Sequence, residues 1–185
     1  MQKEKSIRKW EKIKRKNKYC NLTELKEKIK TCKKTRQGLH RNKILDFLKC
    51  APSFIGCFAE DELEGLSIQS FPSYLIVNVD QSNMSGSHWI AIGIFRDTIE
   101  IFDSLGLQLF NWSRIPCQLL SFLHYFAQSR DVISLKRIQS DTSTLCGFYC
   151  ILYVVYRPFS TFSRLQKLFG PKFSANDSIL IKFFS

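Results

Sequence analysis

Cysteine pairs of the kind that hold a disulfide framework or a zinc ion are missing from this sequence. The seven cysteines are odd in number and scattered, and no two of them are separated by two residues. This pattern fits a reducing compartment better than an oxidising one. We therefore predict a protein without a bound metal ion or other cofactor.

Long apolar runs are missing as well. No run approaches the roughly 20 residues that span a bilayer as a helix. The first residues are polar and charged, without the apolar core of a signal peptide. We expect a soluble protein that is not secreted, does not bind membranes and acts inside cells or inside a particle assembled there.

Acidic residues are scarce at the start of the chain. Residues 1–43 contain 17 Lys or Arg against 4 Asp or Glu, whereas the remainder contains 11 basic and 12 acidic residues. We predict a basic, partly helical arm over residues 1–43 and a near-neutral domain over residues 44–185. Such arms meet nucleic acid, an anionic surface or an acidic partner, and a solvated helical face or a localisation signal is the alternative. The candidate nucleic-acid contacts are Lys9, Lys12, Lys14, Arg15, Lys16 and Lys18.

The aromatic content, 14%, argues against general disorder because such side chains must be buried. The runs at residues 74–80, 88–95 and 98–102 predict adjacent strands, the last two joined by a two-residue turn at Arg96 and Asp97. Helices are predicted at residues 42–49, 117–129, 146–156, 162–169 and 177–184, with one more strand at residues 132–138. The predicted class is α+β with a mostly antiparallel central sheet.

Cys146 lies between a polar stretch and an apolar run that has no polar face. We expect this run to form a buried helix, with side chains of residues 141–144 capping it. A thiol at a helix N-terminus faces N–H groups and a dipole that favour the thiolate. Cys146 is therefore the candidate nucleophile, and Gly147 is expected to let a substrate backbone approach closely. A buried structural cysteine is the alternative; for Cys150, one turn further on, we expect a place in the core.

His88 and Asp103 are the candidate base and orienting acid. His88 lies where a Gly/Ser loop enters a predicted strand, and Asp103 ends the neighbouring strand of the same hairpin. Antiparallel pairing places the two residues at one end of the sheet, where a carboxylate can accept the ring N–H and fix its tautomer. The alternatives are an ordinary surface or core histidine and a turn-starting aspartate.

Gln139 stands in the loop that leads from the last predicted strand to Cys146. Its amide N–H₂ and the backbone N–H of Cys146 are expected to face one space, where together they would hold a developing oxyanion. The order His, Asp, Gln, Cys is far more specific than any one of these residues.

These residues resemble adenain, the maturation protease of adenoviruses, whose relatives occur in virophages and Polinton-type elements. The match covers roughly residues 48–156, and ubiquitin-like-protein proteases share the fold and the order of catalytic residues. The motifs that carry it are Phe54-Ile55-Gly56, His88-Trp89 after a Gly/Ser loop, Phe102-Asp103 followed by Gly106, and Gln139 shortly before Cys146-Gly147.

The resemblance implies a papain-like/adenain-like fold with the nucleophile at the N-terminus of a buried helix. It implies a cysteine endopeptidase that cleaves viral capsid or other virion precursor proteins during particle maturation, after small residues such as Gly. Trp89 and Gly147 would bind substrate. The protein would be a monomer, found in the viral factory or nucleus of the host cell and packaged in the virion. The reduced part after Pro158 and the basic arm depart from adenain, without touching the catalytic set.

Three alternatives stay open. The first is a protease for ubiquitin or a ubiquitin-like modifier, and the second is an acetyltransferase of the same fold. The third is a basic nucleic-acid-binding protein without enzymatic activity. Gln139 favours hydrolysis over acetyl transfer, because an oxyanion donor at that position is the protease pattern.

Overall fold

The computed structural model describes residue 27, residues 38–106 and residues 115–184. No helix in this part of the chain is long and apolar enough to cross a membrane. The elements are α3 (Arg41–Leu48), β1 (Phe54–Ala59), the 3-10 helix η1 (Glu60–Glu62), β2 (Ser73–Asn78), β3 (Trp89–Ile94), β4 (Thr98–Phe102), α4 (Cys117–Ala127), β5 (Asp131–Ser134), α5 (Cys146–Tyr156), the 3-10 helix η3 (Arg157–Phe159), α6 (Phe162–Gln166) and α7 (Phe173–Phe183).

The strands form one five-stranded mixed sheet in the order β1-β2-β3-β4-β5. The predicted α+β class is confirmed, but the expectation of a mostly antiparallel sheet is corrected. β2, β3 and β4 pair antiparallel, whereas the edge strands β1 and β5 pair parallel with their neighbours. Parallel pairing needs a long crossover, and residues 60–72 and 103–130 supply the two crossovers.

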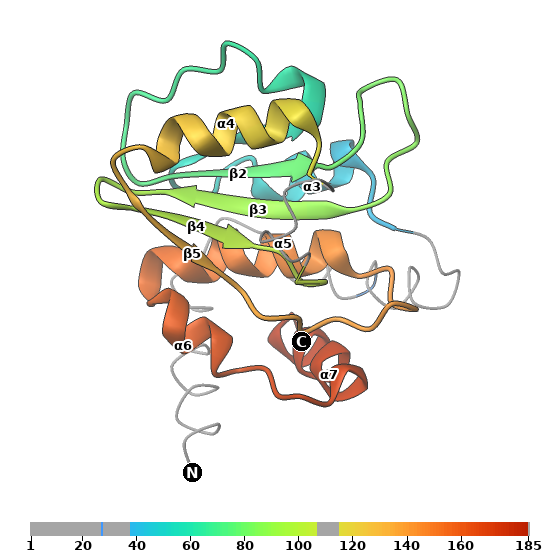
Figure 1. The fold of residues 1–185 in the computed structure, drawn as a ribbon. Coiled ribbons are helices and arrows are strands. Elements are labelled where there is room, and N and C mark those ends of the chain that lie inside the picture. The colour runs from blue at the N-terminus through green and yellow to red at the C-terminus, as the bar shows by residue number, and fades with distance from the viewer. Residues whose placement is uncertain (1–26, 28–37, 107–114, 185) are drawn as a thin grey trace.

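Helices cover both faces of the sheet (Figure 1). α4 lies on one face, and α5 lies on the other with α6 and α7 beyond it. Every residue of β2 and of β3 is buried, as expected for strands covered on both sides. All residues of α5 are buried as well, which agrees with the absence of a polar face in its sequence.

The three central strands, β2, β3 and β4, are confirmed. The prediction differs from the structure at the two edge strands, β1 and β5. The hairpin closes at Arg96 and Asp97, since the N–H of Phe95 donates to the carbonyl of Thr98 at 2.8 Å. β1 was not predicted, because Gly56 interrupts its pattern and shifts its register. The strand predicted at residues 132–138 ends at Ser134, after which the chain turns toward the core.

The segment in front of β1 belongs to the core of the α5 face. Leu39, Ile44 and Leu48 are buried there, and α3 contacts both α5 and β1. Residue 44 therefore lies inside a packed helix. The division of the chain into an arm and a domain stays a prediction.

Candidate active site

His88 and Asp103 lie at one end of the sheet, as the hairpin predicts. His88 directly precedes β3 and Asp103 directly follows β4, and these strands are antiparallel neighbours. Nε2 of His88 is 2.7 Å from Oδ1 of Asp103. Both residues are buried, with 5% and 3% of their surface exposed. This pair is thus shielded from the solvent that weakens ion pairs at protein surfaces.

A tight turn fixes the Asp103 carboxylate. Its Oδ1 also accepts the backbone N–H of Leu105 at 2.9 Å, and its carbonyl accepts the N–H of Gly106 at 3.0 Å. Gly106 has a φ of 59°, and a Cβ there would lie 2.6 Å from the backbone nitrogen of Arg137. Glycine is needed at this position for both reasons.

The His88 ring lies between Asp103 and Cys146. Since Nε2 faces Asp103, Nδ1 is the nitrogen left for the hydrogen bond with Cys146. Burial lowers the pKa of His88, but hydrogen bonds and charge interactions with Asp103 and Cys146 outweigh it and raise the pKa to about 9. The ring is therefore protonated at neutral pH. A protonated imidazole beside a cysteine favours the thiolate.

Cys146 is the first residue of α5, and Leu145 is its N-cap. The expectation that residues 141–144 cap this helix is wrong, because no side chain does so. Asp141 instead pairs with Arg137, and the Ser143 hydroxyl donates to Asp177 at 3.3 Å. The first N–H groups of a helix have no partner inside it. An uncapped end leaves them oriented toward a negative charge.

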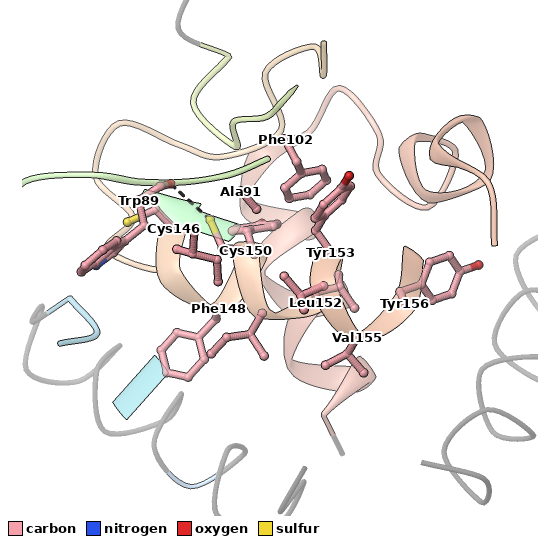
Figure 2. Close-up of a cluster of buried hydrophobic side chains, with 14 of the residues drawn as sticks. Trp89, Ala91, Phe102, Cys146, Phe148, Cys150, Leu152, Tyr153, Val155 and Tyr156 are labelled. Atoms are coloured by element: carbon pink, nitrogen blue, oxygen red, sulfur yellow. Dashed lines mark hydrogen bonds between the residues drawn. The ribbon is translucent and has the colours of Figure 1, made fainter. Parts of the chain in front are cut away.

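Two further buried thiols differ from Cys146 in their surroundings. Cys150 lies one turn along α5 in the core, as predicted, and its Sγ donates to the carbonyl of Trp89 at 3.3 Å (Figure 2). Burial raises the pKa of Cys150 well above its ordinary value, and raises that of Cys57 to about 12. Both are therefore thiols rather than thiolates and are poor nucleophiles.

Gln139 is held by hydrogen bonds at both ends of its side-chain amide. Oε1 accepts the hydroxyl of Ser104 at 2.5 Å, and Nε2 donates to the carbonyl of Ser143 at 2.6 Å. Ser143 lies in the loop that ends at Cys146. The amide is thus fixed on the same loop that carries the thiol.

A groove of about 440 Å³ opens beside Cys146. Its walls are residues 38–41, residues 81–87 of the β2–β3 loop, and Trp89. A larger cavity of about 1050 Å³ lies between α4 and residues 63–71 and contains none of the four candidate catalytic residues. The smaller groove is the one that can bring a substrate to the thiol.

The acidic 3-10 helix η1 ties both walls of the groove together. The Arg41 guanidinium is 2.8 Å from the Glu62 carboxylate and holds the pKa of that carboxyl below its usual value. Asp61 accepts the backbone N–H of Ser82 at 2.8 Å and its hydroxyl at 2.7 Å. The N-terminal segment and the β2–β3 loop are therefore fastened to one element.

Trp89 and Gly147, the candidate substrate contacts, lie side by side. Nε1 of Trp89 donates to the carbonyl of Leu39 at 2.8 Å, and Trp89 lines the groove. Glycine at 147 has a packing role, because a Cβ there would lie 3.0 Å from Cβ of Leu39 and 3.4 Å from Trp89. Substrate contact by either residue stays a prediction.

Sequence reasoning missed Ser104 and Leu39. Ser104 looked like part of an ordinary turn after Asp103, and Leu39 lies within the stretch assigned to the basic arm. One usable signal was the three- and four-residue spacing of Ile44, Phe47 and Leu48, which marks a buried helical face shortly after Leu39. The six candidate nucleic-acid contacts, from Lys9 to Lys18, lie outside the described residues.

Within residues 38–106 and 115–184, no group of three or more His, Cys, Asp or Glu side chains is arranged to hold a metal ion.

No protein-family profile and no curated protein sequence matches the chain. Among solved structures, the chain is similar to SUMO protease Ulp1 with its catalytic cysteine oxidized to a sulfenic acid, at 16% identity and a TM-score of 0.30. The match covers 60% of this chain and 52% of that one, so the chain spans about half of that structure's length.

Proposed function

We propose that this protein is a cysteine endopeptidase. The observation that carries the proposal is the buried hydrogen-bonded series Asp103, His88, Cys146, which places a protonated imidazole beside the thiol at the uncapped start of α5. A nucleophile, its base and the group that orients the base are the parts that covalent catalysis on an amide requires.

The first half of the reaction forms a thioester. With His88 protonated, the thiol proton of Cys146 already lies on Nδ1 of His88, and the thiolate attacks the carbonyl carbon of the scissile peptide bond. The carbonyl oxygen becomes an oxyanion, which the backbone N–H of Cys146 and the free N–H of Gln139 hold. As the oxyanion collapses, the C–N bond breaks and His88 gives its proton to the leaving amine.

The second half releases the acyl product. His88, now neutral, removes a proton from water, and the resulting hydroxide attacks the thioester carbonyl. A second oxyanion forms in the same place and collapses, breaking the C–S bond. The sulfur leaves as the thiolate beside the protonated His88, which restores the starting pair. Asp103 stabilises the imidazolium in both halves without taking a proton.

The proposed substrates are capsid or other virion precursor proteins, cleaved after small residues such as Gly during particle maturation. The support is the resemblance to adenain in His88-Trp89, Asp103, Gln139 and Cys146-Gly147. A protease for ubiquitin-like precursors is the second candidate, because that class shares the same catalytic order. The proposed setting is an infected cell, with the basic arm binding nucleic acid without sequence preference.

The test compares the full-length protein with Cys146→Ala on two substrate sets. Capsid precursors form one set, ubiquitin-like precursors with C-terminal extensions form the other, and a defined peptide mixture locates the preferred bond by mass. We expect the wild type to cleave and the variant to lose roughly 10³-fold or more of its activity. The substrate set that is cleaved decides between the two candidates.

Cys117→Ala is the matched control, because it removes an exposed thiol on α4, on the opposite face of the sheet. It should leave cleavage unchanged. Near-normal turnover by Cys146→Ala would refute the mechanism. Transfer of an acetyl group from acetyl-CoA to a peptide, without cleavage, would assign the protein to the acetyltransferase alternative instead.

A further inference from the structure

The hydroxyl of Ser104 donates a hydrogen bond to the side-chain oxygen of Gln139. We propose that Ser104 is a positioning residue for the reaction proposed above, because it fixes the amide so that one N–H points at the developing oxyanion. The inference rests on that proposed function, since an oxyanion forms only if Cys146 attacks a carbonyl.

A planar amide held at both ends has one direction left for its remaining N–H. The side chain of Gln139 offers one carbonyl oxygen and two N–H donors. Ser104 Oγ donates to Oε1 at 2.5 Å, and one N–H donates to the carbonyl of Ser143 at 2.6 Å. The second N–H then lies in a fixed plane, on the loop that ends at Cys146.

The two partners also fix which end of the amide faces which way. The Ser143 carbonyl can only accept, so it requires the nitrogen end of Gln139. The Ser104 hydroxyl donates to the oxygen end. Ser104 and Gln139 are 0% and 1% exposed, so removing the hydroxyl would leave Oε1 buried without this donor. An amide held at one end can pivot, and a pivot moves the oxyanion donor.

The backbone of Ser104 performs a separate task. Its carbonyl accepts the N–H of Ile138 at 2.9 Å and that of Gln139 at 2.8 Å. These bonds hold the main chain of Gln139 and do not involve the hydroxyl. Ser104→Ala therefore removes the contact to the amide and keeps the contacts that place the loop.

The experiment measures kcat and KM for full-length wild type, Ser104→Ala, Gln139→Ala and the double variant. The probe is the peptide that the wild type cleaves fastest in the defined mixture, made fluorogenic. We expect Ser104→Ala to lower kcat by roughly 10-fold to 100-fold with KM unchanged, since an oxyanion contact acts in the transition state. In the Gln139→Ala background the same change should have no further effect.

Two further measurements and one further variant separate positioning from mere structural support. The C-terminal aldehyde of the acyl half forms a tetrahedral adduct with a thiol, so Ser104→Ala should weaken its binding by the factor lost in kcat. Alkylation of Cys146 by iodoacetamide should keep its rate, because His88 and Asp103 activate the thiol. Ser104→Thr, which retains a hydroxyl, should recover part of kcat if thermal unfolding shows that it folds.

Full kcat in Ser104→Ala would overturn the inference. So would an equal loss of kcat in the Gln139→Ala background, or a slower alkylation of Cys146, since either points to a general structural defect. Activity in Cys146→Ala would refute the proposed function itself. An inactive Cys146→Ala variant together with a fully active Ser104→Ala variant would refute the positioning role alone.

Discussion

Replacing Asp103 with Asn removes one buried negative charge from the candidate site and almost no volume. Oδ1 of Asp103 accepts from two groups, the His88 ring at 2.7 Å and the N–H of Leu105 at 2.9 Å. An Asn with its oxygen in that place can keep both bonds. The variant therefore tests the charge on the carboxylate more than the geometry of the turn.

The expected magnitude follows from the pKa of His88. Burial lowers this pKa, and Asp103 together with Cys146 raises it to about 9. Without the Asp103 charge the pKa falls. If it reaches the ordinary value of about 6.5, the protonated fraction of the ring at pH 8 falls from about 0.9 to about 0.03, a loss of about 30-fold.

The assay is the pH profile of kcat/KM and of Cys146 alkylation, measured from about pH 6 to about pH 10. In the wild type, activity should decline as the pH rises through about 9, because His88 then loses the proton that it gives to the leaving amine. In Asp103→Asn this decline should begin at least about one pH unit lower. Asp97→Asn, an exposed change at the opposite end of the hairpin, is the matched control.

Stability should follow the same titration. Because the pKa of His88 is raised in the folded state, its protonated ring stabilises the fold fully at pH values below its unfolded-state pKa of about 6.5. That contribution is lost as the pH rises through about 9. The melting temperature of the wild type should therefore decline more over this window than that of Asp103→Asn. If kcat/KM of Asp103→Asn declined at the same alkaline pH as that of the wild type, Asp103 would not be the partner that raises the pKa of His88.

Three further results are expected. Gln139→Ala should lower kcat roughly 10²-fold to 10³-fold with little change in KM, and a rise in KM alone would make it a binding residue. Gly93→Ala should destabilise the fold by about 1–3 kcal/mol, because its Cβ would collide with the buried Tyr153 hydroxyl, which donates to Glu100. Chemical denaturation measures this loss of stability, which should be smaller in a Tyr153→Phe background. A chain shortened to begin at Gly38 should keep peptide cleavage and lose DNA binding. In fluorescence anisotropy the full chain should release DNA between about 50 and 200 mM salt, and equal affinity with and without residues 1–37 would exclude the arm as the DNA contact.

The centre of the fold could be predicted because its residues carry strong local patterns. The runs around Leu75 and Ile92 are mostly apolar and become strands that are buried in every position, and α5 is apolar throughout, so burial decides their structure. β1 could not be predicted in the same way. Its strand depends on pairing with β2, a contact between residues far apart in the chain, and Gly56 breaks the local signal.

The residue types of the candidate site could be predicted from the sequence, but the hydrogen bonds that hold those residues in place could not. His88, Asp103 and Cys146 follow from chain order, because the hairpin and the start of α5 place them at one end of the sheet. The bond from Ser104 to Gln139 spans 35 positions, and no sequence pattern announces it. The capping prediction failed for a similar reason, since Ser143 finds Asp177 on α7 instead of the start of α5.

The position of Leu39 couples two parts of the chain. Leu39 packs against Gly147, and its carbonyl holds Trp89, yet it lies only two residues beyond residue 37. A ligand that bound the preceding basic segment and stabilised the packing of Leu39 would pre-form the groove wall. A ligand that displaced Leu39 would open that wall. Linkage makes such an effect reciprocal, so that substrate in the groove would change the affinity for that ligand by the same factor. Through Leu39 alone, ligand binding to the basic segment and substrate binding in the groove could therefore influence each other.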